Sequence, residues 1–143
     1  IEAIFRKALT EPHYCETYAD LVFNLNSAFP QFPSRHGGKP MTFKSSVLNV
    51  CQNEFEELLT SADEELAHSS EEDADAEELE YHRRKRKDRM RANMKFVGHL
   101  FLRQLLSAKV MSSVIMELVL CGENADHVPE DHAIECACEL LTS

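Results

Sequence analysis

The stretch NMKFVGHLFLRQLL at residues 93–106 decides the fold of this chain. Its apolar residues recur at spacings of three and four, which places them on one side of a helix that faces a core: Phe96, Val97, Leu100, Phe101 and Leu105. Gly98 interrupts this apolar face, and because it has no side chain it predicts a close approach of two helices. The apolar run is shorter than the roughly 20 residues that cross a bilayer, so a membrane span is not expected.

The rest of the chain has the same helical character. Four glycines, five prolines and the absence of alternating β-branched runs in 143 residues predict an all-α fold. Pro12 and Pro129 suit first helical positions, Thr42 and Ser107 suit N-caps, and Gly122 suits a helix end. Between the first two long helices, residues 30–41 form a connector rich in Pro and Gly.

Each expected helix has one apolar stripe, which we predict to face the core. The stripes are Tyr14, Tyr18, Leu21, Val22, Leu25 and Phe29; then Phe43, Val47, Leu48, Cys51, Phe55, Leu58 and Leu59; then Val110, Val114, Ile115, Leu118 and Val119; and finally Ile134, Ala137, Cys138 and Leu141.

Short turns between these helices favour stacked antiparallel helix pairs of the HEAT or armadillo type, with repeats of about 40–47 residues. A compact helical bundle is the alternative. The chain begins at Ile1 and stops at Ser143 directly after an apolar helix pattern. We therefore expect residues 1–143 to form a single HEAT-type domain that is truncated at both ends.

Charge is unevenly distributed. The formal net charge is 15 − 25 = −10, which argues against a general polyanion binder. Residues 60–91 are acidic and then basic, and we expect a solvated, partly disordered insertion with helical stretches near its ends. Ser69 and Ser70 precede acids and suit an acid-directed kinase. The basic part contains Arg83, Arg84, Lys85, Arg86, Lys87, Arg89 and Arg91.

This basic part has two interpretations. It could bind RNA, since each Lys or Arg can replace a counterion condensed on the phosphates. It could also be neutralised by the acidic segment before it on the same tether. We favour the second slightly, because the acids outnumber the bases and no aromatic side chains stand between the arginines to stack on bases.

Motifs for catalysis are absent from the sequence: it has no glycine-rich phosphate loop, G-x-S-x-G elbow or H-E-x-x-H pair. We expect neither an enzyme nor a cofactor. A metal-like cluster comprises Cys121, His127, His132, Cys136 and Cys138, but Cys136 and Cys138 lie about 200° apart around a helix, so both cannot easily face one ion. We interpret the five cysteines as reduced core residues of a cytoplasmic protein.

Four segments resemble, in the same order, motifs of the MIF4G family, named for the middle domain of eukaryotic translation initiation factor 4 gamma. NMKFVGHLFLRQLL is similar to its N-[IM]-[KR]-F-[IV]-G helix. EPHYCETYADL (11–21), FKSSVLNVCQNEFEE (43–57) and IECACELLT (134–142) resemble three further helices. Val50, Asn53 and Ala92 depart from the family pattern, which puts the basic contacts of that region in doubt.

The resemblance implies a HEAT-repeat scaffold that binds the DEAD-box RNA helicase initiation factor 4A and promotes its ATP-dependent unwinding. Messenger RNA and other initiation factors are further partners that it implies. Cap-binding protein and poly(A)-binding protein would bind only segments outside this chain. On the matched motifs, the candidate helicase contacts are Glu11, His13, Tyr14, Asn49, Gln52, Glu54, Lys95 and His99.

Two other functions remain open at this point. The chain could be a MIF4G-containing translational regulator or mRNA-decay factor, or an RNA-binding module that uses residues 83–91.

Overall fold

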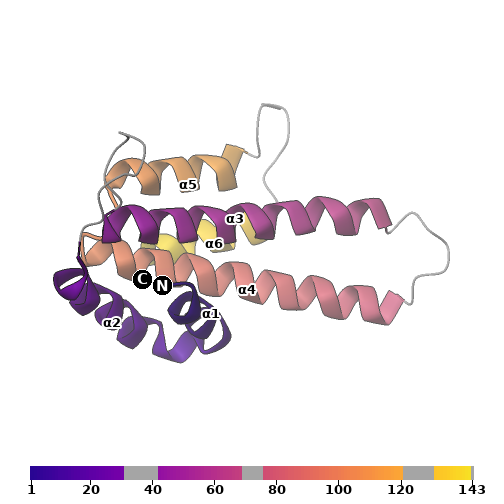
Figure 1. Cartoon of the computed structure of the whole chain (residues 1–143). Helices are drawn as coiled ribbons and strands as arrows, with labels where there is room; N and C mark the ends of the chain where they lie inside the picture. Colours follow the sequence, from indigo (N-terminus) through magenta and orange to yellow (C-terminus); the bar gives the residue numbers. More distant parts are fainter. Residues whose placement is uncertain (31–41, 69–75, 121–130, 143) are drawn as a thin grey trace, which may run out of the picture.

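The computed structural model describes residues 1–30, 42–68, 76–120 and 131–142 (Figure 1). Within these ranges the chain is helical and contains no strand, which confirms the predicted all-α class. The elements are α1 (Glu2–Thr10), the short 3-10 helix η1 (Pro12–Tyr14), α2 (Cys15–Ala28), α3 (Phe43–His68), α4 (Ala76–Leu102), α5 (Ala108–Leu120) and α6 (Asp131–Thr142).

Three of the predicted helix starts are confirmed. The Ser45 N–H donates to Thr42 Oγ1 at 3.2 Å, and the Thr42 N–H donates back to Ser45 Oγ at 3.0 Å. This reciprocal cap satisfies donors that the first turn of α3 leaves without a helical partner. At the start of α5, Ser107 Oγ accepts a hydrogen bond from the Val110 N–H at 3.4 Å. Pro12 begins η1, whereas Gly122 and Pro129 lie outside the described residues.

Helix α4 ends with Gln104 in the left-handed region, at φ 58°. The Gln104 N–H donates to the Phe101 carbonyl at 2.8 Å, and the Leu105 N–H donates to the Leu100 carbonyl at 3.1 Å. These two bonds form a Schellman motif, where glycine is the usual residue. The Lys44 ammonium donates to the Gln104 carbonyl at 2.9 Å, which ties the end of α4 to the start of α3.

The helices form three consecutive pairs: α1 with α2, α3 with α4, and α5 with α6. The second helices pack on one another, α2 on α4 and α4 on α6, so that α4 lies at the centre of a continuous layer (Figure 1). Helices α3 and α5 form the other layer and make no comparable contact with each other. This arrangement is the predicted stack of helix pairs.

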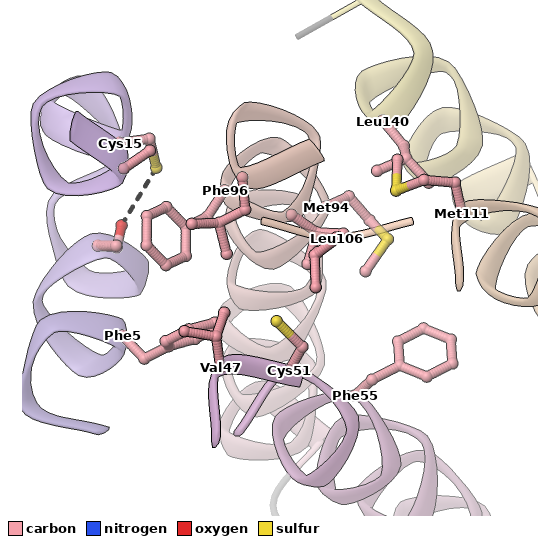
Figure 2. Packing of buried hydrophobic residues seen from close by; sticks show 14 of the residues in the cluster. Phe5, Cys15, Val47, Cys51, Phe55, Met94, Phe96, Leu106, Met111 and Leu140 are labelled. Atoms are coloured by element: carbon pink, nitrogen blue, oxygen red, sulfur yellow. Dashed lines mark hydrogen bonds between the residues drawn. The ribbon is translucent and has the colours of Figure 1, made fainter. Parts of the chain in front are cut away.

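The core lies on two sides of α4. On one side Phe96 points toward α1, where the Phe5 ring meets it edge to face with ring centroids 4.7 Å apart. On the other side Met94 points toward Met111 of α5 and Leu140 of α6 (Figure 2). Both Phe96 and Met94 are fully buried. The other members of the predicted α4 stripe are buried or half-buried, as expected.

The predicted stripe of α2 is partly wrong. Tyr14, Leu21 and Phe29 are 59%, 44% and 47% exposed, and the fully buried face consists of Cys15, Ala19 and Val22. Small residues take this face because α2 and α4 approach closely, which leaves no room for large side chains.

The same error occurs in α6. Ile134, Cys138 and Leu141 are exposed, while Cys136, Ala137 and Leu140 are buried. Of the predicted stripe only Ala137 faces the core. Cys138 is therefore not a core cysteine, whereas Cys15, Cys51 and Cys136 are buried as predicted. Cys121 lies outside the described residues.

Much of segment 60–91 is helical. Helix α3 continues to His68, and α4 begins at Ala76. The two helices run side by side beyond the rest of the molecule (Figure 1). Ser69 and Ser70, the expected phosphorylation sites, lie outside the described residues.

Candidate interaction surfaces

The α1–η1–α2 corner contains three of the candidate helicase contacts. Glu11 is half-buried and already engaged: its carboxylate accepts from Lys7 Nζ at 2.8 Å and from the Tyr18 hydroxyl. These bonds lower the pKa of Glu11 and raise that of Tyr18. Glu11 thus fixes the angle between α1 and α2, which is a structural function.

His13 and Tyr14 of the same corner are exposed. Tyr14 ends η1, Leu21 lies in the second turn of α2, and both side chains are more than 40% exposed. Large apolar side chains that are exposed together often mark a place where a partner binds. The corner therefore combines a rigid support with an accessible aromatic and aliphatic surface.

The candidates on α3 do not share one environment. Asn49 and Gln52 are exposed, and the Gln52 amide donates to Glu56 Oε1 at 2.8 Å. The Glu54 side chain is only 13% exposed and accepts from Arg89 Nη2 of α4 at 2.7 Å. Glu54 therefore joins α3 to α4, while Asn49 and Gln52 remain accessible.

Lys95 and His99 lie half-buried on α4. Burial lowers the pKa of His99, and the neighbouring Arg103 lowers it further. Arg103 itself binds Asp20 of α2 at 2.7 Å and approaches Glu16 at 3.7 Å. This cluster joins α4 to α2, so we interpret His99 as part of a packed interface and not as a solvent-facing contact.

Arg103 and its acidic partners were not among the sequence candidates. The ion pair joins residues 83 apart in the sequence. No local pattern could have identified it, because nothing near Arg103 in the chain indicates that α2 lies beside it.

The basic residues 83–91 divide into paired and unpaired groups. Arg89 binds Glu54, and Arg91 binds Glu135 of α6. The bond from Arg91 lowers the pKa of Glu135. Two of the predicted RNA contacts thus join α4 to α3 and to α6, while the predicted pairing with the acidic segment that precedes them stays a prediction.

Arg84, Lys85 and Lys87 are exposed, and among the described residues none has an acidic partner. Arg84 and Lys87 are three apart and lie on one side of α4, together with Arg91. Arg83 and Arg86 are half-buried. The accessible positive charge of the segment is therefore limited to a short strip.

Asn93 is fully buried, and neither atom of its side-chain amide has a hydrogen-bond partner among the described residues. Buried polar groups without partners are rare, and each costs about 1–3 kcal/mol. Asn93 is the first residue of the motif that defines the fold, but its polarity was not recognised from the sequence as a core feature.

The possible metal ligands that the structure describes, His132, Cys136 and Cys138, do not come together, and Cys121 and His127 lie outside the described residues. His132 Nε2 lies 3.6 Å from Cys136 Sγ, while Cys138 is exposed. Among the described residues no three His, Cys, Asp or Glu side chains converge on one point. Burial raises the pKa of Cys136 to about 11 and that of Cys51 to about 12, so both thiols stay protonated near neutral pH.

A helix that is long and apolar enough to cross a membrane is not found in the described part of the chain.

Three stacked pairs of helices place the described part of the chain in the class of helical-repeat proteins. The sequence model of the MIF4G domain matches residues 1–143. The chain belongs to the MIF4G domain family, which is a family of scaffolds and not of enzymes.

Three proteins that are similar to this chain over its whole length, or nearly so, are named as translation initiation factors. Eukaryotic translation initiation factor 4G of Arabidopsis thaliana is 37% identical over 147 residues, covering 100% of this chain and 8% of the relative. The Oryza sativa subsp. japonica protein of the same name is 34% identical over 156 residues, again covering 100% of this chain and 8% of the relative. Human eukaryotic translation initiation factor 4 gamma 3 is 28% identical over 154 residues, which cover 100% of this chain and 9% of the relative. The chain thus spans less than a tenth of each.

Proposed function

We propose that this chain is a scaffold domain of translation initiation that binds the DEAD-box RNA helicase initiation factor 4A. One observation carries the proposal: the family match extends over residues 1–143, and the similar proteins are named as initiation factor 4G. The chemistry would take place on the helicase. The scaffold would supply a rigid surface that both helicase domains contact.

Such a scaffold acts by shifting a conformational equilibrium. If it binds a nearly closed helicase ten times more tightly than an open one, the closed form gains about 1.4 kcal/mol, and its population relative to the open form rises tenfold. The stack suits this function, because α4 packs on four other α-helices and on η1, and these contacts support the surface.

Tyr14 and Leu21 are our choice for the centre of the helicase contact. Both are exposed, lie in the η1–α2 part of the corner, and belong to one matched motif. His13 lies beside them. Glu11 and His99 would support this surface through packing, as would Glu54 for α3.

The test is stimulation of helicase ATPase activity by the intact chain and by Tyr14→Ala. A tyrosine at the centre of an interface contributes about 2 kcal/mol, so we expect the concentration for half-maximal stimulation to rise about 30-fold. Tyr81→Ala is the matched control, because Tyr81 of α4 is 61% exposed and Tyr14 is 59% exposed.

Absence of stimulation by the parent chain at saturating concentration would contradict the activating function. Partners recovered from a nuclease-treated extract then distinguish the alternatives. Cap-complex proteins support the initiation scaffold, and decay factors support a regulator.

RNA binding is a second candidate function, favoured by the exposed cations Arg84, Lys85 and Lys87. We expect the affinity for a single-stranded oligouridylate to fall with salt. Replacing Arg84 and Lys87 by Gln should reduce the slope of log K against log salt by about 1.4, which is about 0.7 for each lost phosphate contact. An unchanged slope would exclude this strip from RNA binding.

A further inference from the structure

A groove lies between α3 and α5, the first helices of the second and third pairs. Its volume is about 440 Å³, within the range of about 300–1,000 Å³ that is typical of binding pockets. The groove exists because α5 packs on α6 and not closely on α3, so the outer layer is open at this point. Met94 and Val97 of α4 lie at its base.

The walls of the groove are apolar. Leu48 and Phe55 belong to the α3 wall, and Val110 and Val114 to the α5 wall. Leu48, Val110 and Val114 are half-buried, so their side chains retain apolar surface that a partner can cover. A partner that filled the groove would therefore gain from apolar burial on both sides.

The rims of the groove are acidic. Glu56 and Gln52 stand on the α3 rim, and Glu117 and Ser113 on the α5 rim. All four are exposed. Glu56 accepts a hydrogen bond from Gln52, and among the described residues neither carboxylate has a basic partner. A negative charge thus stands on each side of an apolar floor.

We propose that this groove binds a basic amphipathic helical segment of a partner protein. Apolar side chains at positions i, i+3 or i+4, and i+7 would enter the groove, and Lys or Arg on the flanks would reach Glu56 and Glu117. The two carboxylates oppose acidic segments and nucleic acid, so charge selects the occupant. This site is separate from the α1–η1–α2 corner proposed for the helicase.

The test uses two fluorescein-labelled helical peptides with leucines at a spacing of three and four. One has lysine at the remaining positions, and the other has glutamate there. Fluorescence anisotropy at physiological salt should show binding of the lysine peptide to the intact chain and no binding of the glutamate peptide. Equal binding of both peptides, or of neither, would overturn the proposal.

Two matched pairs of variants locate the binding. The double variant Glu56→Lys with Glu117→Lys should bind the lysine peptide at least tenfold more weakly than the parent chain does. Glu2→Lys with Glu80→Lys, which makes the same change of net charge at exposed residues outside the groove, should weaken it less than threefold. If both double variants lost the same affinity for the peptide, the binding would be due to general charge attraction, and the groove would not be the binding site.

Ser113→Trp should fill the groove and abolish binding, whereas Ser112→Trp should not. Both serines are exposed neighbours on α5, and only Ser113 lines the groove. Binding retained by a folded Ser113→Trp variant, with circular dichroism equal to that of the parent, would also contradict the site. If this variant does not fold, the charge-reversal pair decides.

The assay contains no helicase. Its failure therefore leaves the scaffold proposal standing, and failure of ATPase stimulation leaves this groove standing.

Discussion

The first half of α4, residues 76–91, and its second half, residues 92–102, belong to one helix but are held in place by different forces. In the second half Met94, Phe96 and Leu100 are fully buried. In the first half, among the residues whose side chains the structure describes, only Met90 is buried, and Arg89 and Arg91 join the helix to its neighbours through ion pairs. Apolar burial is worth more than partly exposed ion pairs, so stability should be concentrated in the second half.

The strongest test of this comparison is truncation of one aromatic side chain in each half. Phe96→Ala should lower the free energy of unfolding by about 4 kcal/mol, because it leaves a cavity against Phe5. Tyr81→Ala, at an exposed position of the first half, should change it by less than about 0.5 kcal/mol. Urea denaturation followed by circular dichroism measures both, and similar losses would refute the comparison.

A charge buried in the second half of α4 should lower the free energy of unfolding nearly as much. Asn93→Asp should cost about 3 kcal/mol at pH 7, since the site is fully buried and none of the described residues offers a partner to the amide. The loss relative to the parent should shrink near pH 4, where the new carboxyl is protonated.

Asn24→Asp on the exposed surface of α2 is the control for this substitution. A small loss from Asn93→Asp at pH 7 would mean that water reaches this part of the core.

Acid should also weaken the packing around the second half. Burial lowers the pKa of His99, as it does that of His132, so the unfolded chain binds these protons more readily than the folded one. Their contribution is complete above the ordinary histidine pKa of about 6.5, and it is lost as the pH falls from that value through the lower pKa of the folded state. Arg103 lowers the pKa of Asp20 and Arg91 that of Glu135, so those contributions are lost at still lower pH.

We expect Tm to fall between pH 7.5 and 5.5, and His99→Gln to reduce that fall. His82→Gln, at an exposed position of the first half, is the control. A Tm that rose on acidification would show that the sign of the linkage is wrong.

The smallest expected effect lies at the junction of the two halves. A double-mutant cycle of Arg89→Ala and Glu54→Ala should give a coupling energy of about 1 kcal/mol, since Glu54 is largely buried and Arg89 is 41% exposed. The cycle of Arg91→Ala and Glu135→Ala should give less, because both of those side chains are about half exposed. The reverse order would mean that burial does not set the strength of these pairs.

Much of this fold could be predicted from the sequence. The helical class, the stacked pairs, the caps at Thr42 and Ser107 and the inward face of residues 93–106 follow from local patterns, and the structure agrees with them. Local patterns succeed here because a cap or a large apolar stripe uses only neighbouring residues.

The faces of α2 and α6 could not be predicted in this way. Their buried faces consist largely of small residues such as Ala19 and Cys136, while larger side chains such as Tyr14 and Leu141 point outward. Periodicity gives weight to large apolar residues, but where helices approach closely only small ones fit.

The candidate contacts show a related limit. Glu11, Glu54 and Arg89 stay predicted partner contacts, and each of them also binds a residue of this chain, which the sequence did not indicate. Glu54 and Arg89 are 35 residues apart, and the sequence does not indicate which acid faces which base. A surface can be assigned only after such pairs have been taken into account.

The central position of α4 has a consequence for cooperativity. In a long array of repeats the terminal units can unfold separately, because most units do not contact one another. With three pairs, the middle pair contacts both of the others. Here α4 packs against α1 and α2 of the first pair, α3 of its own pair and α6 of the third. Loss of α4 would remove a packing partner from all three pairs at once, so the described helices should unfold in a single transition, as one thermodynamic unit and not as a series of repeats.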